Sequence, residues 1–205
     1  MNKIIEVEIR GPLDQDGYSE VLDFLNKNGT FVKTKNRVMI DYSTLNETGG
    51  MESRTKDIRL RVTNGIPEVM IKIGSWGESE ARRELSILTK KGTFDDLVEI
   101  FGHLGWKKGM LCVRNSEVFL YKSVEFSLVE VPGHSYYFEA ELMISESDSK
   151  KEAVKKIKNI CKEMGLVVFS KKAFFRYVGE LNEEVNEIFD FDQYSVGYFK
   201  KRFLL

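Results

Sequence analysis

Residues 4–10, Ile-Ile-Glu-Val-Glu-Ile-Arg, alternate between apolar and charged side chains. Alternation with a period of two predicts a β-strand, because successive side chains leave a pleated backbone on opposite faces. The apolar face holds Ile5, Val7 and Ile9, and the charged face holds Glu6, Glu8 and Arg10. Two carboxylates this close on one face repel each other, and a divalent ion such as Mg²⁺ or Mn²⁺ would relieve that repulsion. The simpler interpretation is a half-buried strand with a charged outer face.

The same alternation recurs in three later segments. Residues 57–62 and 69–74 carry basic groups on the polar face, and residues 138–142 carry a second pair of acids. The charged positions there are Asp57, Arg59 and Arg61, then Lys72, then Glu139 and Glu141. If these faces converge inside a barrel, the acids would hold cations while the bases bind a polyanion. A charged interior without a ligand would be costly to desolvate, so the pattern predicts a wet, functional tunnel.

The composition limits the classes of protein to which the chain can belong. Its 205 residues are 42% hydrophobic and 31% charged, enough for one domain with a real core. The net charge of −1 argues against a general nucleic-acid-binding surface. Two cysteines, Cys112 and Cys161, indicate buried free thiols rather than a disulfide framework or a zinc site. We see no signal peptide and no apolar run near the roughly 20 residues of a membrane span, so we expect a cytoplasmic protein.

The remaining patterns predict strands and helices in a repeated order. Segments 30–42 and 106–121 are each interpreted as a hairpin, the first around Lys35-Asn36, and the second half repeats the order of the first. Helices are expected over 93–105, with a stripe of Leu97, Ile100, Phe101 and Leu104, and from a cap at Ser147 to Met164. A short strand is expected at 167–169, and an acidic, then aromatic helical tail from residue 179.

Taken in order, these motifs resemble the CYTH superfamily of triphosphate tunnel metalloenzymes, which includes thiamine triphosphatases and class IV adenylyl cyclases. The opening Glu6-x-Glu8-x-Arg10 resembles the signature acidic strand, and Arg59-Leu-Arg61, Lys72 and Arg83-Glu84 resemble the basic and middle motifs. The later matches are Arg114, the Glu139-x-Glu141 strand and Lys172-Ala173-Phe174. The resemblance spans residues 4 to about 178. The chain also departs from the family pattern. Val129 stands where the family usually has an aspartate, Ser116 where a second base is common and Ser86 where a second acid is frequent, and Ala173-Phe174 replaces Ser-Tyr.

The resemblance implies an α+β fold: a closed antiparallel β-barrel forming a tunnel in residues 1–178, with outer helices and a packed helical tail at 179–205. It implies metal-dependent hydrolysis of an organic or inorganic triphosphate, or cyclisation of ATP. Catalytic roles fall to Glu6, Glu8, Arg10 and Lys72, and metal binding to Glu6, Glu8, Glu84, Glu139 and Glu141. Phosphate binding falls to Arg59, Arg61, Lys72, Arg83, Arg114 and Lys172. The implied partners are Mg²⁺ or Mn²⁺ and a nucleotide, thiamine triphosphate or tripolyphosphate.

Two alternatives stay open at this point. The departures at Val129 and Ser116 favour a binding module that captures a polyphosphate or nucleotide without turning it over, whereas the paired acids favour the enzyme. A plain structural barrel leaves the paired acids on two strands unexplained. A homodimer is one assembly that the resemblance allows.

Overall fold

The computed structural model describes residues 4–46, 53–76, 79–145 and 148–204. Its strands are β1 (Ile4–Leu13), β2 (Thr30–Asp41), β3 (Lys56–Thr63), β4 (Ile66–Ile73), β5 (Ser79–Leu88), β6 (Lys108–Tyr121), β7 (Val124–Val131), β8 (Ser135–Ser145) and β9 (Glu187–Asp190). Its helices are α1 (Gln15–Asn28), α2 (Ser43–Asn46), α3 (Phe94–His103), α4 (Lys150–Glu163), α5 (Lys171–Glu184), the 3₁₀ turn η2 (Phe191–Gln193) and α6 (Tyr198–Phe203).

The first eight strands form a closed antiparallel barrel, as expected from the sequence. Neighbouring strands follow the order β2-β3-β4-β5-β1-β8-β7-β6, and pairing of β6 with β2 closes the ring. Because the ring is closed, each of these eight strands pairs with a neighbour on both sides over at least part of its length. The short strand β9 pairs with residues 108–111 of β6, beyond the part of β6 that pairs with β7.

The apolar faces of the strands point outward, where helices cover two sides of the barrel. On one side, Val7, Ile9, Phe126 and Phe138 pack with residues of α1 and α4 in one core. On the other, β2, β3 and β6 pack against α3 and the aromatic residues of the C-terminal segment. This segment approaches α3 so closely that a Cβ atom on Gly102 would lie 2.4 Å from the ring of Phe191. The alternation predicted for the first strand is therefore confirmed, with the charged side chains inside.

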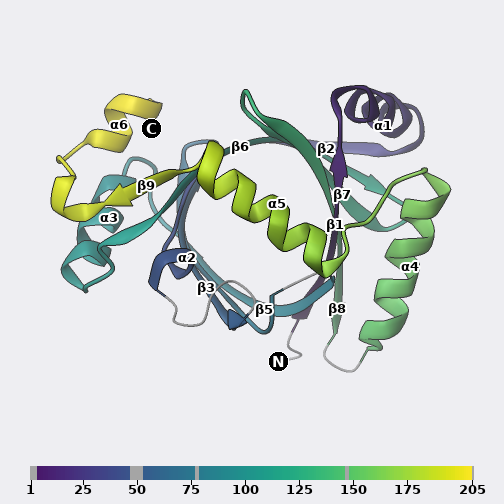
Figure 1. Cartoon of the computed structure of the whole chain (residues 1–205), viewed down its shortest axis with the longest axis horizontal. Helices are drawn as coiled ribbons and strands as arrows, with labels where there is room; N and C mark the ends of the chain where they lie inside the picture. The colour runs from purple at the N-terminus through teal and green to yellow at the C-terminus, as the bar shows by residue number, and fades with distance from the viewer. Residues whose placement is uncertain (1–3, 47–52, 77–78, 146–147, 205) are drawn as a thin grey trace.

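Helix α5 crosses one mouth of the barrel (Figure 1). A third apolar cluster holds it there, made of Trp76, Phe169, Phe174 and Phe175. Trp76 is buried against both phenylalanines of α5, with ring centroids 5.1 Å and 5.5 Å apart. The tryptophan is thus a packed anchor that joins the segment after β4 to the helix over the mouth.

The sequence predicted hairpins in segments 30–42 and 106–121, and both predictions are wrong, because each segment forms one long strand. Lys35 and Asn36 continue β2 and pair with Ser116 and Asn115 of β6. Their φ angles are not positive, whereas the turns between β3 and β4 and between β6 and β7 do contain positive-φ residues. The segment 106–121 is likewise one strand from Lys108. Long strands are needed here because β2 and β6 close the barrel by pairing with each other over almost their full length.

Other boundaries also differ from the sequence expectations. Residues 167–169 form no strand; this segment instead crosses β1, where the amide of Phe169 donates to the carbonyl of Arg10. Ile100 and Leu104 are exposed, because the face of α3 that packs inward carries Phe94, Val98 and Gly102. The cap of α4 is Ser149, while Ser147 lies outside the described residues. The boundary at 178/179 falls inside α5, and the segment beyond α5 contains β9 as well as helices.

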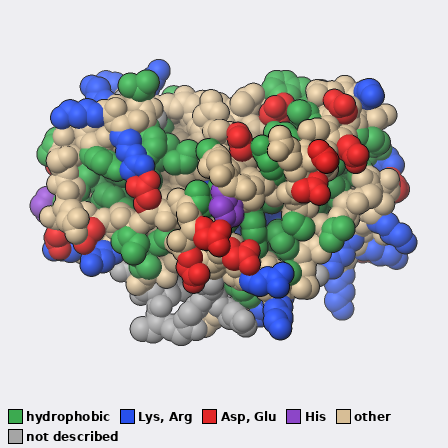
Figure 2. Space-filling model, turned by 45° about the horizontal axis from the view of Figure 1, so that its top comes forward, with side chains coloured by type: hydrophobic (Ala, Val, Ile, Leu, Met, Phe, Trp, Pro, Cys, Tyr) green, Lys and Arg blue, Asp and Glu red, His purple; other side chains and the backbone are tan. Residues whose placement is uncertain are grey.

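On the face drawn in Figure 2, acidic and basic side chains occur in small interspersed groups. Both cysteines are buried free thiols, as we expected. Among the helices of the described residues, none has the length and apolarity of a membrane span.

Candidate functional site

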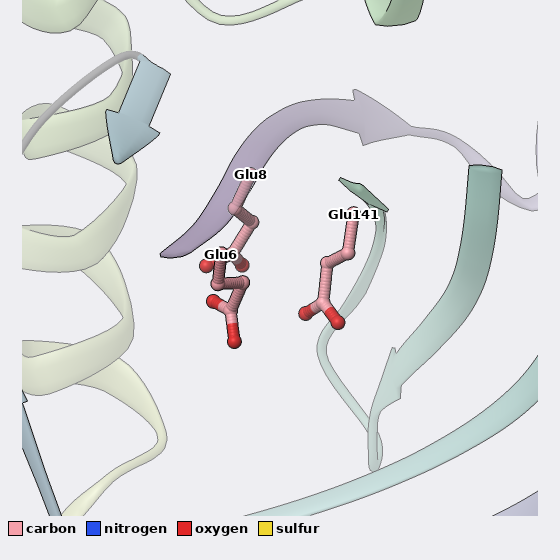
Figure 3. A group of neighbouring side chains, drawn as sticks. All are labelled: Glu6, Glu8 and Glu141. Carbon is pink, nitrogen blue, oxygen red and sulfur yellow. The ribbon is translucent and has the colours of Figure 1, made fainter. Parts of the chain in front are cut away.

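Three carboxylates meet inside the barrel. Glu6 and Glu8 project from β1, and Glu141 projects from β8, where it pairs in register with Glu8 (Figure 3). One oxygen atom of each carboxylate lies within 4.8 Å of the other two. A cluster of carboxylate oxygens is the donor set that Mg²⁺ and Mn²⁺ prefer. These residues therefore fit a divalent cation.

The electrostatics of the three carboxylates also indicate a place for positive charge. Burial raises the pKa of Glu6 to about 7, with Glu8 and Glu84 adding to the effect and Lys72 opposing it. Burial and the neighbouring acids Glu8, Glu6 and Glu139 raise the pKa of Glu141 well above its ordinary value. Glu8 is only 1% exposed, yet Arg10, Lys72 and Arg82 outweigh burial and lower its pKa. Two of the three acids thus lack sufficient positive charge around them.

Within the part of the chain that the structure describes, Lys72 and Arg10 form ion pairs with this cluster. The ammonium of Lys72 lies 2.5 Å from Glu6 and 3.5 Å from both Glu8 and Glu84. Arg10 lies 2.5 Å from Glu8 and 3.2 Å from Glu139. Burial would lower the pKa of Lys72, but Glu8 and Glu6 outweigh it, so the pKa is raised and the lysine stays charged. These bases neutralise the acids only in part.

Most of the residues predicted for the site do face the tunnel. One cavity of about 130 Å³, which we call the central chamber, is lined by charged side chains alone. They are Glu6, Glu8, Arg10, Lys35, Arg37, Arg59, Arg61, Lys72, Glu84, Glu139 and Glu141. Within it, Arg61 pairs with Glu68 and lies 3.2 Å from Glu84.

Two predicted residues are not brought to the tunnel. Arg83 is exposed and pairs in register with Ile73, whose side chain points outward. Lys172 is exposed near the start of α5. The arginine that faces inward at this level is Arg82, which is 2% exposed and donates to Asp57 at 2.6 Å. The alternation rule could have found it, because Arg82 and Glu84 are two residues apart and share a face, whereas Arg83 and Glu84 do not.

Sequence reasoning also missed Lys35 and Arg37 on β2, because the segment was interpreted as a hairpin. Arg37 donates to Thr63 at 3.0 Å, and among the described residues no carboxylate pairs with it. Burial, and then the nearby guanidinium of Arg61, lower the pKa of Arg37. A half-buried cation that pairs with no carboxylate favours the binding of an anion.

A second cavity of about 130 Å³ lies between the central chamber and α5, and we call it the α5 chamber. Arg10, Arg37, Arg59 and Glu139 line both cavities. Arg114, predicted as a phosphate ligand, lines only the α5 chamber and donates to Asn186 at 3.0 Å.

Val129, Ser116 and Tyr137 also line this chamber. Val129 therefore points inward. Glu130, the next residue along β7, points away from the chamber and accepts from Asn115 at 3.1 Å.

Comparisons with solved structures agree with the fold. The PH1819 protein from Pyrococcus horikoshii is 24% identical, with a TM-score of 0.70 over 85% of this chain and 98% of that chain. A candidate adenylate cyclase from Vibrio parahaemolyticus is 15% identical, with a TM-score of 0.61 over 84% of this chain and 93% of that chain. HpAC1 from Hippeastrum, a candidate adenylyl cyclase with a dominant triphosphatase activity, is 15% identical, with a TM-score of 0.51 over 87% of this chain and 96% of that chain.

No protein-family model matches the chain, and no curated protein matches it significantly. At these identities the similarity shows a shared barrel fold.

Proposed function

We propose that this chain binds and processes a triphosphate inside the barrel with the help of Mg²⁺ or Mn²⁺, as CYTH proteins do. The observation that carries the proposal is the acid cluster of Glu6, Glu8 and Glu141 in a fully charged chamber beside basic residues. A polyanion with its metal ion would neutralise both kinds of charge at once. Without such a ligand, the raised pKa values of Glu6 and Glu141 are an unrelieved cost.

The basic side chains would bind and orient the phosphates. Arg59, Arg61 and Arg37 line the central chamber and can donate hydrogen bonds to phosphate oxygens. A metal ion held by Glu6, Glu8 and Glu141 would supply positive charge that stabilises the charge developing in phosphoryl transfer. Lys72 now serves as counter-ion to Glu6 and Glu8, and neutralisation of these acids would free it to bind a phosphate oxygen.

The structural neighbours support a triphosphate as the substrate. One is described as a candidate adenylate cyclase, and HpAC1 as having a dominant triphosphatase activity. Hydrolysis and cyclisation both begin with a triphosphate held in place by cations, so the same tunnel serves either reaction.

The test is a substrate panel. Tripolyphosphate, ATP, GTP and thiamine triphosphate are incubated with Mg²⁺ or Mn²⁺, and phosphate, pyrophosphate and cyclic nucleotide are measured. Release of phosphate indicates hydrolysis, and pyrophosphate together with cyclic nucleotide indicates cyclisation. Glu8→Gln and Glu141→Gln should abolish turnover, while the exposed control Glu20→Gln should retain it. Unchanged turnover in both tunnel variants would sink the proposal for the metal site.

A second candidate function is capture of a polyphosphate or nucleotide without turnover. The uncharged residues Val129 and Ser116 at inward positions favour it, because they remove charged groups from the tunnel wall. Tight binding of a triphosphate with no product under any metal condition would select this function.

A further inference from the structure

A groove of about 750 Å³ lies on the outside of the barrel and shares no lining residue with either chamber. We call it the α1 groove, because it runs between α1 and the linker of residues 164–170 that joins α4 to α5. At the right of Figure 1, α1 lies above this linker. The groove is lined by residues 12–14, by Gly17, Glu20, Val21 and Phe24 of α1, and by linker residues 164–167.

The floor of the α1 groove is apolar. Val21 is 7% exposed and belongs to the core that α1 and α4 form with the barrel. Phe24, Met164 and Leu166 pack against the same core while each stays partly exposed. Val167 packs less and is 67% exposed. Contact with further apolar side chains would remove this surface from water, which favours binding.

The linker side of the groove is held closely against the barrel. The amide of Phe169 donates to the carbonyl of Arg10 at 2.9 Å. A Cβ atom on Gly11 would collide with the carbonyl oxygen of Val167, so glycine is needed for the linker to lie this close to β1. The amides of Val167 and Val168 form no hydrogen bond with any described residue, so the linker has backbone donors left for a bound segment.

The α1 side of the groove carries a row of negative charge. Asp16, Glu20 and Asp23 are all exposed and recur at i, i+4 and i+7, so they lie along one stripe of α1. Asp14, the cap of α1, lines the groove at the end of this row. Within the described residues none of these four acids forms an ion pair, and Lys27 is the one basic residue that α1 contains.

A partner that fits the α1 groove must bring positive charge and apolar side chains together. Lysine or arginine side chains would pair with the acidic row, while apolar neighbours would cover the floor. The same acids repel nucleic acids and anionic lipid surfaces, which disfavours both as occupants. From Gly17 to Phe24, α1 spans roughly 10 Å, a length that an extended chain covers with about three residues.

We propose that the α1 groove binds an extended segment of another protein that carries both apolar residues and lysine or arginine. The apolar residues lie on the floor beside Val167, and the basic residues lie at the rim beside Glu20. Because the groove shares no residue with the tunnel chambers, this binding needs neither a triphosphate nor a metal ion.

The test is the selection of peptides on the purified chain. A phage-displayed library of random heptapeptides is bound to the wild type, and the enriched sequences are synthesised for measurement of dissociation constants by fluorescence anisotropy. We expect the enriched sequences to combine lysine or arginine with apolar residues. Their binding should weaken as the salt concentration rises, because the charges at the rim are exposed.

Two exposed residues of the groove are then changed in turn. Glu20→Lys reverses one charge of the acidic row and should weaken binding of the selected peptides roughly 10-fold. Val167→Ser removes apolar surface and should weaken it roughly 3-fold to 10-fold. Glu183→Lys, at an exposed position of α5, makes the same change of charge as Glu20→Lys and is the control, which should bind as the wild type does. Melting temperatures establish that each variant is folded.

Three results would overturn the proposal. They are enrichment of no peptide, enrichment of sequences without basic residues, and peptides that bind folded Glu20→Lys and Val167→Ser as tightly as the wild type. Analytical ultracentrifugation tests a different occupant. Self-association of the wild type that is lost in Glu20→Lys would show that a second copy of the chain occupies the groove, and it would also overturn the proposal of a separate partner.

Discussion

Replacement of Asp57 by asparagine perturbs the buried ionic network that holds the basic wall of the tunnel. The side chain of Asp57 is 0% exposed. It lies 2.7 Å from Arg59 and 2.6 Å from Arg82, and it also pairs with Arg54. Asp57→Asn keeps the shape and removes the charge that these three guanidinium groups share.

The loss of stability can be worked out from the pKa of Asp57. Burial would raise this pKa, but Arg59, Arg54 and Arg82 outweigh it and lower the pKa to about 2. A decrease of nearly two pKa units corresponds to about 2.5 kcal/mol, and removal of one partner from a buried ion pair costs about 3–5 kcal/mol. We therefore expect Asp57→Asn to lose about 3 kcal/mol of unfolding free energy at pH 7. For a chain of this length that is a decrease in melting temperature of roughly 6–12 °C.

Urea unfolding of wild type and variant between pH 7 and pH 2 measures the size of this loss of unfolding free energy and the direction in which it changes with pH. Because the pKa in the folded state is lowered, the contribution of Asp57 is present above its ordinary pKa of 3.8 and is lost as the pH falls through about 2. The difference in unfolding free energy between the two proteins should be constant from pH 7 to pH 5 and should then decrease as the pH falls further. Asp23→Asn, at an exposed position of α1, is the control. A difference below about 1 kcal/mol at pH 7, or one that does not narrow in acid, would refute this reasoning.

Three further changes test other parts of the structure. Glu141→Gln should raise the melting temperature of the protein in EDTA at pH 8, because the raised pKa makes its charged form unfavourable in the folded state; a lower melting temperature would contradict this. Arg37→Met should also stabilise the ligand-free protein, while weakening tripolyphosphate binding at least roughly 10-fold in calorimetry; unchanged affinity would exclude Arg37 as a phosphate ligand. Gly102→Ala should cost about 1–3 kcal/mol in urea unfolding, because its Cβ would meet the ring of Phe191; a neutral effect would mean that the ring can move aside.

The alternation of side chains predicted the strands and the charged face of β1, β3, β4 and β8, whereas the closed barrel was predicted from the resemblance to the CYTH superfamily. Glu6, Glu8, Arg59, Arg61 and Lys72 all lie where a period of two places them. The local sequence separates the apolar face of each strand from the charged face, and the closure of the barrel places the charged face inside.

The remaining features depend on pairings between distant segments. Nothing local distinguishes one long β2 strand from a hairpin at Lys35-Asn36; only pairing with β6 does so. Arg54 lies outside the regular strands, and its contacts with Asp41 and Asp57 follow from tertiary structure. Likewise, the α5 chamber exists because α5 returns across the mouth of the barrel, which no periodicity in its sequence reveals.

The most direct test of a triphosphate in the tunnel is the shift in melting temperature caused by tripolyphosphate with Mg²⁺ or Mn²⁺. A ligand at 100 times its dissociation constant adds about 2.7 kcal/mol, or roughly 5–10 °C for a protein of this size. We predict a shift of this order in the wild type and the loss of most of it in Arg61→Ala, whose side chain lines the central chamber. No shift at any metal concentration would contradict the assignment of the tunnel as a triphosphate site.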